Sequence, residues 1–251
     1  VTSSDIDNNG FPDIFVSVFN GPNKLFYNKG PGPDGTPRFQ DVSQMTGIAA
    51  PLKSFPCWFW DVNNDGWEDI LALTYLAGST SAAEITTRYY LEGERVPSPA
   101  LYINQGDGTY KESSEEYNLQ MPLFAMGSNY GDLDMDGWLD GYIGTGAPSY
   151  TAVVPNVVWK NMEGQSFADV TIASGMGHIQ KGHSVGLADF DNDGDEDVFC
   201  VLGGAFEGDI YSDALFLNPT EGRNWISLQL EGTQSNRAAI GALIQINLVE
   251  D

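Results

Sequence analysis

The stretch DLDMDGWLD, residues 132–140, places aspartate at its first, third, fifth and ninth positions and glycine at its sixth. Such crowding is unfavourable, because two carboxylates ~4 Å apart repel by about 4 kcal/mol at an effective dielectric constant near 20. A cation held between the side chains would remove this repulsion, whereas a solvated turn would only weaken it. The rest of the sequence helps to decide between a cation site and a solvated turn.

The same pattern occurs four times, starting at residues 5, 61, 132 and 189, at intervals of 56, 71 and 57 residues. The copies are DIDNNGFPD (5–13), DVNNDGWED (61–69), DLDMDGWLD (132–140) and DFDNDGDED (189–197). The longest interval contains a polar insertion, residues 77–100, before the next apolar segment. Copies at so regular a spacing predict a repeat protein.

Short apolar segments accompany the copies in a constant order. A strand-like segment precedes each of the last three copies, as in FPCWFW (55–60), and a β-rich run follows every copy, as in ILALTYL (70–76). A third segment comes next, as in LYINQG (101–106), and three of the repeats add a fourth, as in TYKESSEEYNL (109–119). We therefore expect each repeat to form four short antiparallel strands.

The turn residues and the absence of helical patterning also favour antiparallel strands. Asp34-Gly35 and Asp107-Gly108 lie between third and fourth segments, where tight hairpin turns are expected. No stretch shows a sustained helical period. We therefore expect an all-β fold, a β-propeller built of four-stranded antiparallel blades, with repeats starting near residues 1, 55, 125 and 183. The four repeats form either a closed propeller or part of a larger one, and a β-sandwich or solenoid is the alternative.

The residue types of the copies are those of a cation site with oxygen ligands. Alternation at positions 1, 3 and 5 lets side chains converge, and glycine at position 6 permits a sharp turn. The carbonyl of position 7 and the carboxylate of position 9 add further oxygens. The copies contain no Cys or His, which disfavours zinc and copper, and magnesium usually keeps several waters. We predict up to four Ca²⁺ sites, with ligands Asp5, Asp7, Asn9, Phe11, Asp13, Asp61, Asn63, Asp65, Trp67, Asp69, Asp132, Asp134, Asp136, Trp138, Asp140, Asp189, Asp191, Asp193, Asp195 and Asp197.

The copies differ from the EF-hand, which has the same spacing through position 6. That motif requires Glu at position 12 and a helix after the loop. Position 12 here is Val16, Ala72, Ile143 or Cys200, each inside an apolar segment. We therefore expect calcium-binding hairpins between strands. Asn9 and Asn63 replace aspartate in the first two copies, so weaker binding is expected there.

The composition favours a protein that binds cations. The chain has 35 Asp plus Glu against 11 Lys plus Arg, for a net charge of −24. This balance argues against nucleic acids and anionic membranes, both of which need a basic face. No run of 18 apolar residues is present, so we expect no membrane insertion. Cys57 and Cys200 are far apart in sequence and form no CxxC motif, so each is expected to be a small buried side chain.

One stretch resembles a catalytic motif. GHSVG, residues 182–186, matches the G-x-S-x-G nucleophile elbow of α/β-hydrolases, which needs a strand, a turn, a helix and a later histidine. The chain's two histidines, His178 and His183, both precede Ser184, and a strand-like segment and an acidic copy follow it. Paired carboxylates could also act on glycosidic bonds, but calcium ligation explains the acids better. We expect no enzymatic activity.

The D-x-D-x-D-G-x-x-D copies between strand-like segments resemble FG-GAP (VCBS-type) repeats, which also form the propellers of integrin α-subunits. The phrase LYINQGDGTYKESSEE (101–116) is similar to the blade phrase of those repeats. Residues 203–248 are similar to the junction of a last FG-GAP blade with an ASPIC/UnbV domain, through NWISLQLEG (224–232) and SNRAAIGA (235–242). The resemblance implies blades over residues 1–222 and the start of an ASPIC/UnbV-like β segment over residues 223–251.

The resemblance also implies a place and a role. FG-GAP propellers are calcium-loaded modules of secreted or cell-surface proteins that serve adhesion, ligand binding or assembly. We accordingly expect an extracellular, cell-surface or periplasmic location and a protein or glycan ligand. A homo-oligomer or filament is the alternative for a self-assembling subunit of a surface layer, and a glycan-binding or glycan-acting propeller is a third possibility. Propellers of this type commonly have seven blades, whereas four repeats are found here.

Overall fold

The computed structural model describes residues 1–76, 81–150 and 152–220, and in the C-terminal part residues 226–233, 237–239, 242 and 244–246. The chain forms two units, Val1–Thr220 and Glu221–Asp251. The predicted ASPIC/UnbV-like segment lies partly outside the described residues, and its described part contains no strand.

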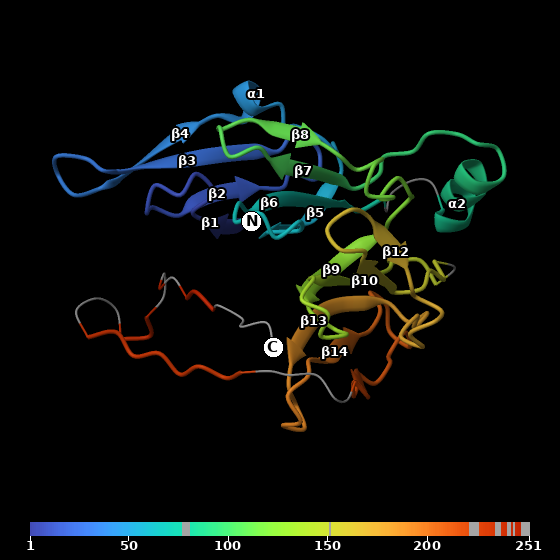
Figure 1. The fold of residues 1–251 in the computed structure, drawn as a ribbon. Coiled ribbons are helices and arrows are strands. Elements are labelled where there is room, and N and C mark those ends of the chain that lie inside the picture. The colour runs from blue at the N-terminus through green and yellow to red at the C-terminus, as the bar shows by residue number, and fades with distance from the viewer. Residues whose placement is uncertain are drawn as a thin grey trace. The chain divides into compact units, whose positions relative to one another are not determined.

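The first unit contains four antiparallel sheets, one for each sequence repeat, which we number repeats 1 to 4 (Figure 1). Repeat 1 consists of β1 (Thr2–Ser4), β2 (Asp13–Val16), β3 (Lys24–Pro31) and β4 (Pro37–Asp41). Repeat 2 consists of β5 (Ser54–Trp60), β6 (Asp69–Thr74), β7 (Ala100–Asn104) and β8 (Tyr110–Glu112). Repeat 3 consists of β9 (Ala125–Gly131), β10 (Asp140–Thr145), β11 (Val157–Asn161) and β12 (Phe167–Asp169). Repeat 4 has three strands, β13 (Gly182–Ala188), β14 (Asp197–Leu202) and β15 (Ala214–Phe216).

The strands follow one another in sheet order, so the predicted all-β fold of antiparallel four-stranded units is confirmed for three repeats. The fourth has only three strands among the described residues, which departs from the predicted four-stranded unit and agrees with the lack of a fourth apolar segment in that repeat. The first hairpin also has the same register in every repeat, because the residue before each acidic copy pairs with the ninth residue of that copy. These pairs are Ser4 with Asp13, Trp60 with Asp69, Gly131 with Asp140 and Ala188 with Asp197.

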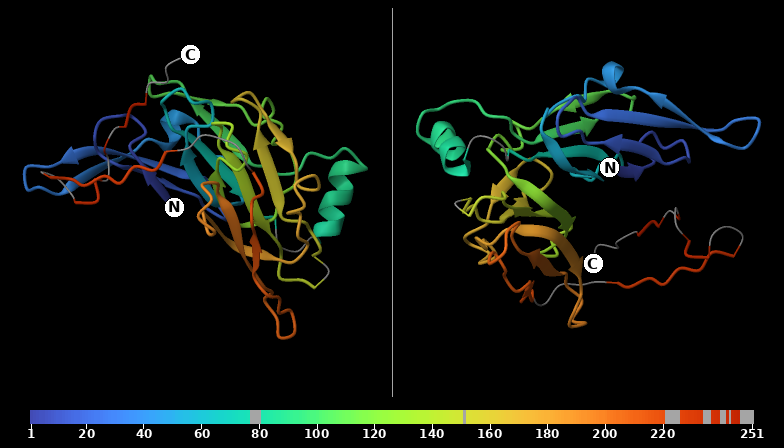
Figure 2. Two further views of the ribbon diagram at one scale, coloured as in Figure 1. Left: turned by 60° about the horizontal axis from the view of Figure 1, so that its bottom comes forward. Right: turned by 180° about the vertical axis from the view of Figure 1, so that it is seen from behind.

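The described residues form two helices outside the sheets, α1 (Ser43–Thr46) and α2 (Ala82–Tyr90) (Figure 2). Helix α2 corrects the expectation that no stretch is helical, because it occupies part of the predicted polar insertion. The Ser81 side chain caps it by accepting a hydrogen bond from the Glu84 backbone N–H at 3.1 Å, and Ile85 is buried against Phe124 and Leu76. Neither described helix is long and apolar enough to cross a membrane.

Consecutive repeats pack through their first strands, β1 against β5, β5 against β9 and β9 against β13. Aromatic side chains fill the space between repeats 2 and 3, where Trp60 stacks on Phe167 with ring centroids 5.5 Å apart. Cys57 and Cys200 are buried free thiols, as predicted. Among the described residues β13 makes no comparable contact with β1, so the ring closure of a complete propeller is not seen in this chain.

Glycines allow repeats 3 and 4 to approach closely. A Cβ atom at Gly127 of β9 would lie 1.7 Å from the His183 carbonyl oxygen of β13, and one at Gly144 would lie 2.9 Å from that of Gly182. Gly182, the first glycine of the GHSVG stretch, therefore takes part in packing. Ser184 lies inside β13, paired with Val201, and is not at a strand-to-helix turn.

Candidate metal centres

Each acidic copy forms the connection between the first and second strands of its repeat, and we call these connections acidic loops 1 to 4. In loop 3 the carboxylate of Asp132, at position 1, accepts hydrogen bonds from the backbone N–H groups of Asp136 and Gly137, both at 2.9 Å. The carboxylates of Asp5, Asp61 and Asp189 accept the same two bonds in the other loops. The first aspartate of each copy thus shapes the loop around itself.

Two residues of each loop have a positive φ. Position 6 is glycine with φ between 86° and 101°, which confirms its predicted role as the turn residue: Gly10, Gly66, Gly137 and Gly194. Position 4 is also left-handed, with φ between 53° and 64°, at Asn8, Asn64, Met135 and Asn192. The second feature was missed, although asparagine in three of four copies is its sequence signal, since asparagine tolerates this conformation.

The aspartate at position 9 is an anchor for the backbone. In repeat 2, Asp69 is fully buried and accepts hydrogen bonds from the backbone N–H groups of Val62, at 3.1 Å, and Asn104, at 2.8 Å. The other repeats contain the same pair of bonds at Asp13, Asp140 and Asp197. Position 9, predicted only as a ligand, therefore also ties the loop to the third strand.

Burial governs the ionisation of three of these anchors, Asp13, Asp69 and Asp140. It raises the pKa values of the Asp69 and Asp140 carboxyl groups to about 7, and that of Asp13 to about 6, although the backbone donors act in the opposite direction. The neighbouring aspartates of the same loop raise the pKa values further. A positive charge nearby would favour the ionised form of these three carboxyl groups.

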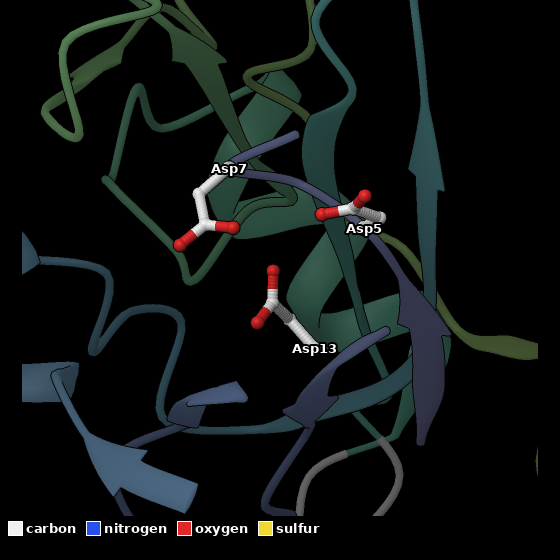
Figure 3. A group of neighbouring side chains, drawn as sticks. All are labelled: Asp5, Asp7 and Asp13. Carbon is white, nitrogen blue, oxygen red and sulfur yellow. The ribbon is translucent and has the colours of Figure 1, made fainter. Parts of the chain in front are cut away.

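The predicted ligands converge in three of the loops. In loop 1 the carboxylates of Asp5, Asp7 and Asp13 point toward one another, with an oxygen of each within 4.8 Å of the others (Figure 3). Groups as close occur in loop 3, at Asp132, Asp134 and Asp136, and in loop 4, at Asp189, Asp191 and Asp197. Loop 2 forms no such group of three acids among the described residues, because its third position is an asparagine. There the Asn63 Nδ2 donates to Asp65 Oδ2 at 2.9 Å.

Other predicted ligands take part in the loop's own hydrogen bonds. The side chain at position 5 accepts a bond from the backbone N–H of position 7, as Asp136 does from Trp138 at 3.0 Å. The same bond joins Asn9 to Phe11, Asp65 to Trp67 and Asp193 to Asp195. The Nδ2 of Asn9 also donates to the Asn28 carbonyl, so in loop 1 this side chain braces the third strand.

Several carboxylate oxygens are buried with no hydrogen-bond partner. They are Asp7 Oδ1 in loop 1, Asp134 Oδ1 in loop 3 and both oxygens of Asp195 in loop 4. Asp195 is only 3% exposed, and burial, followed by the charge of Asp193, raises its pKa to about 6. Its carbonyl oxygen was the predicted ligand, but its carboxylate also faces the other acids of the loop. Because an unpaired buried anion is costly, these oxygens fit a bound cation.

Two lysine side chains already place positive charge at the loops. The Lys160 ammonium contacts the carboxylates of Asp134 and Asp136 in loop 3, the latter at 2.9 Å. The Lys29 ammonium lies 3.5 Å from Asp7 in loop 1. The carboxylates of loops 1 and 3 are thus paired with lysine ammonium groups, and these lysines would compete with a metal ion for the same oxygens.

A family model described as FG-GAP-like repeat matches residues 5–72 and again residues 61–143. Together the two matches span residues 5–143, more than half of the 251-residue chain. The chain belongs to the FG-GAP-like repeat family. Each match begins at the first aspartate of an acidic loop, Asp5 or Asp61, and ends in the second strand of the next repeat. The FG-GAP-like unit of this chain therefore contains two successive acidic loops. A comparison with curated proteins found no match.

Proposed function

We propose that the acidic loops bind Ca²⁺ and that the chain is a calcium-stabilised, non-catalytic module of an extracellular, cell-surface or periplasmic protein. The observation that carries the proposal is the convergence of three carboxylates in loops 1, 3 and 4, with buried oxygens that lack a partner. Oxygen ligands from a short, glycine-containing loop suit calcium better than a softer metal. The ion would neutralise the repulsion between the closely spaced carboxylates of each loop.

The role of such a module is binding or assembly, with the sheets arranged as blades of a β-propeller. Membership of the FG-GAP-like repeat family and the net charge of −24 support a protein that works in a calcium-rich environment and contacts a protein or glycan ligand. A non-catalytic role is supported by the place of Ser184 inside a strand and by the use of the loop acids as backbone anchors.

Calcium titration of the chelator-treated chain tests the proposal. We expect calorimetry to detect binding. We also expect the thermal unfolding midpoint to be higher in about 1–2 mM Ca²⁺ than in chelator, since this concentration is well above the dissociation constants of sensor-type calcium sites. Asp134→Asn is the matched variant, because Asp134 accepts no backbone hydrogen bond and the loop can keep its shape. It should lose one binding site, while its midpoint in chelator falls only by what the contact with Lys160 contributes, since Asp136 still pairs with that ammonium. Absence of binding heat together with equal midpoints would overturn the proposal.

Lys160→Gln should increase the calcium affinity of loop 3, because it removes the ammonium that contacts Asp134 and Asp136. We expect an increase of about three- to tenfold, since a partly buried ion pair exceeds an exposed pair in strength. Calcium titration calorimetry measures it. Lys29→Gln is the control, because the Lys29 ammonium pairs with one carboxylate, Asp7, at 3.5 Å and should change loop 1 less. An unchanged or lower affinity in Lys160→Gln would show that the lysine does not compete.

A further inference from the structure

One asparagine in the third strand, or directly after it, makes the same local contacts in every repeat. In repeat 3, Asn161 donates its backbone N–H to the anchor Asp140 at 2.8 Å, and its Oδ1 accepts from the Gly164 N–H at 2.8 Å. Its Nδ2 donates to the Leu139 carbonyl, at position 8 of its own loop, at 3.2 Å. Asn28, Asn104 and Asn218 repeat these three bonds with their own loops and turns.

The same amide group also reaches the preceding repeat. Asn104 Nδ2 donates to the Ile6 carbonyl of loop 1 at 2.9 Å, Asn161 to Val62 of loop 2 at 2.9 Å, and Asn218 to Leu133 of loop 3 at 2.6 Å. Each acceptor is position 2 of its loop, between the predicted ligands at positions 1 and 3. The bond therefore fixes the backbone that carries those two ligands.

The asparagine of repeat 1 lacks this second contact. Within the described part of the chain, Asn28 Nδ2 donates only to Pro12 of its own loop, at 3.1 Å. Its local contacts otherwise match those of the other three asparagines. Asn28 is therefore a natural control that separates the local bonds from the bond between repeats.

Loops 2 and 3 are in contact at other points as well. Asn64 Nδ2, from loop 2, donates to the Gly137 carbonyl of loop 3 at 3.0 Å. Gly164, which follows Asn161, approaches loop 2 so closely that a Cβ there would lie 2.9 Å from the Asn63 Cα. The geometry of loop 2 is thus connected to that of loop 3 by an exposed hydrogen bond and by a close backbone approach.

We propose that these asparagines couple neighbouring acidic loops, so that calcium bound in one loop raises the affinity of the loop before it. The inference rests on the proposed calcium binding. An ion in the later loop orders the position-9 anchor and the position-8 carbonyl, which together hold the asparagine. The asparagine then holds the position-2 carbonyl of the earlier loop, so that loop loses less conformational entropy when it binds. The coupling is reciprocal, because both ligands bias the same contacts.

Loops 3 and 4 offer the clearest test, through Asn218. A parent chain with Asp7→Asn and Asp65→Asn weakens loops 1 and 2 and leaves the other two loops to be titrated with Ca²⁺. We expect Asp191→Asn, which disables loop 4, to lower the affinity of loop 3 about fivefold in this parent. In a parent that also carries Asn218→Ala, the same change should lower it less than twofold. Asn161→Ala is the matched control, because it removes the equivalent local bonds at loop 3 but keeps the bond from Asn218 to Leu133.

The outcomes separate the coupling from calcium binding itself. Equal losses with and without Asn218, or no loss in the parent, would overturn the coupling alone, whereas absence of calcium binding in the unmutated chain would overturn both. A second measurement needs no calcium: in chelator, Asn104→Ala should lower the urea midpoint more than Asn28→Ala, because only the first breaks a bond between repeats. Equal midpoints would contradict the coupling even where Asn218→Ala fails to fold.

Discussion

Asp69→Ala should lower the free energy of unfolding of the calcium-free chain by about 2–6 kcal/mol. The side chain is fully buried and accepts the backbone N–H groups of Val62 and Asn104. Its removal leaves two buried donors without partners, and each unsatisfied donor costs about 1–3 kcal/mol. The loss should appear as a lower urea midpoint, followed by tryptophan fluorescence in the presence of chelator, so that metal binding does not contribute.

Two further variants of loop 2 sharpen this result. Asp69→Asn should fall between the wild type and Asp69→Ala, because its amide oxygen still accepts one N–H while its Nδ2 faces the other. Asp65→Asn should change stability by less than about 0.5 kcal/mol. Asn9 occupies the same position in loop 1 and accepts the equivalent backbone bond from Phe11. If Asp65→Asn destabilised the calcium-free chain as much as Asp69→Ala, position 9 would not be the anchor of the loop.

Local order in this fold is readable from the sequence because the contacts that set it are close in the chain. Strand segments, sheet order and the glycine turn follow from the spacing of the copies, as the pairing of Trp60 with Asp69 across one loop illustrates. Helix α2 spans only nine residues, too few for a helical period to be evident, yet Ser81 and Glu84 form the S-x-x-E signal of a capped helix start. This capping signal, and not a helical period, predicts where the helix begins.

The second function of position 9 depends on partners that are distant in sequence. Asp69 meets Asn104 only after β7 has paired with β6, and no spacing rule within the copy predicts that bond. The recurrence of asparagine in the third segment of every repeat was the available signal. Contacts between repeats are harder still, because they join segments such as β9 and β13 whose closeness depends on how two complete sheets pack.

Gly127→Ala should destabilise the chain by about 3 kcal/mol, near the upper end of the usual cost of overpacking. The added Cβ would lie 1.7 Å from the carbonyl oxygen and 2.5 Å from the carbonyl carbon of His183. Both atoms belong to the backbone, so no side-chain rotation can relieve the contact, and β9 must separate from β13. Urea unfolding measures the loss of stability. Relative to the wild-type chain, the variant should lose more hydrogen-exchange protection in β13 and β14 than in the strands of repeats 1 and 2.

Gly186→Ala provides the matched control within the same pair of sheets. Gly186 lies in β13, no atom lies within 4 Å of the Cβ that alanine would add, and its φ is outside the left-handed region. Alanine at such a position should be neutral or slightly stabilising, because it restricts the unfolded chain without a clash in the folded one. If both variants lost stability equally, the cost would come from alanine in this sheet in general. If only Gly127→Ala does so, the close approach of repeats 3 and 4 is what requires glycine.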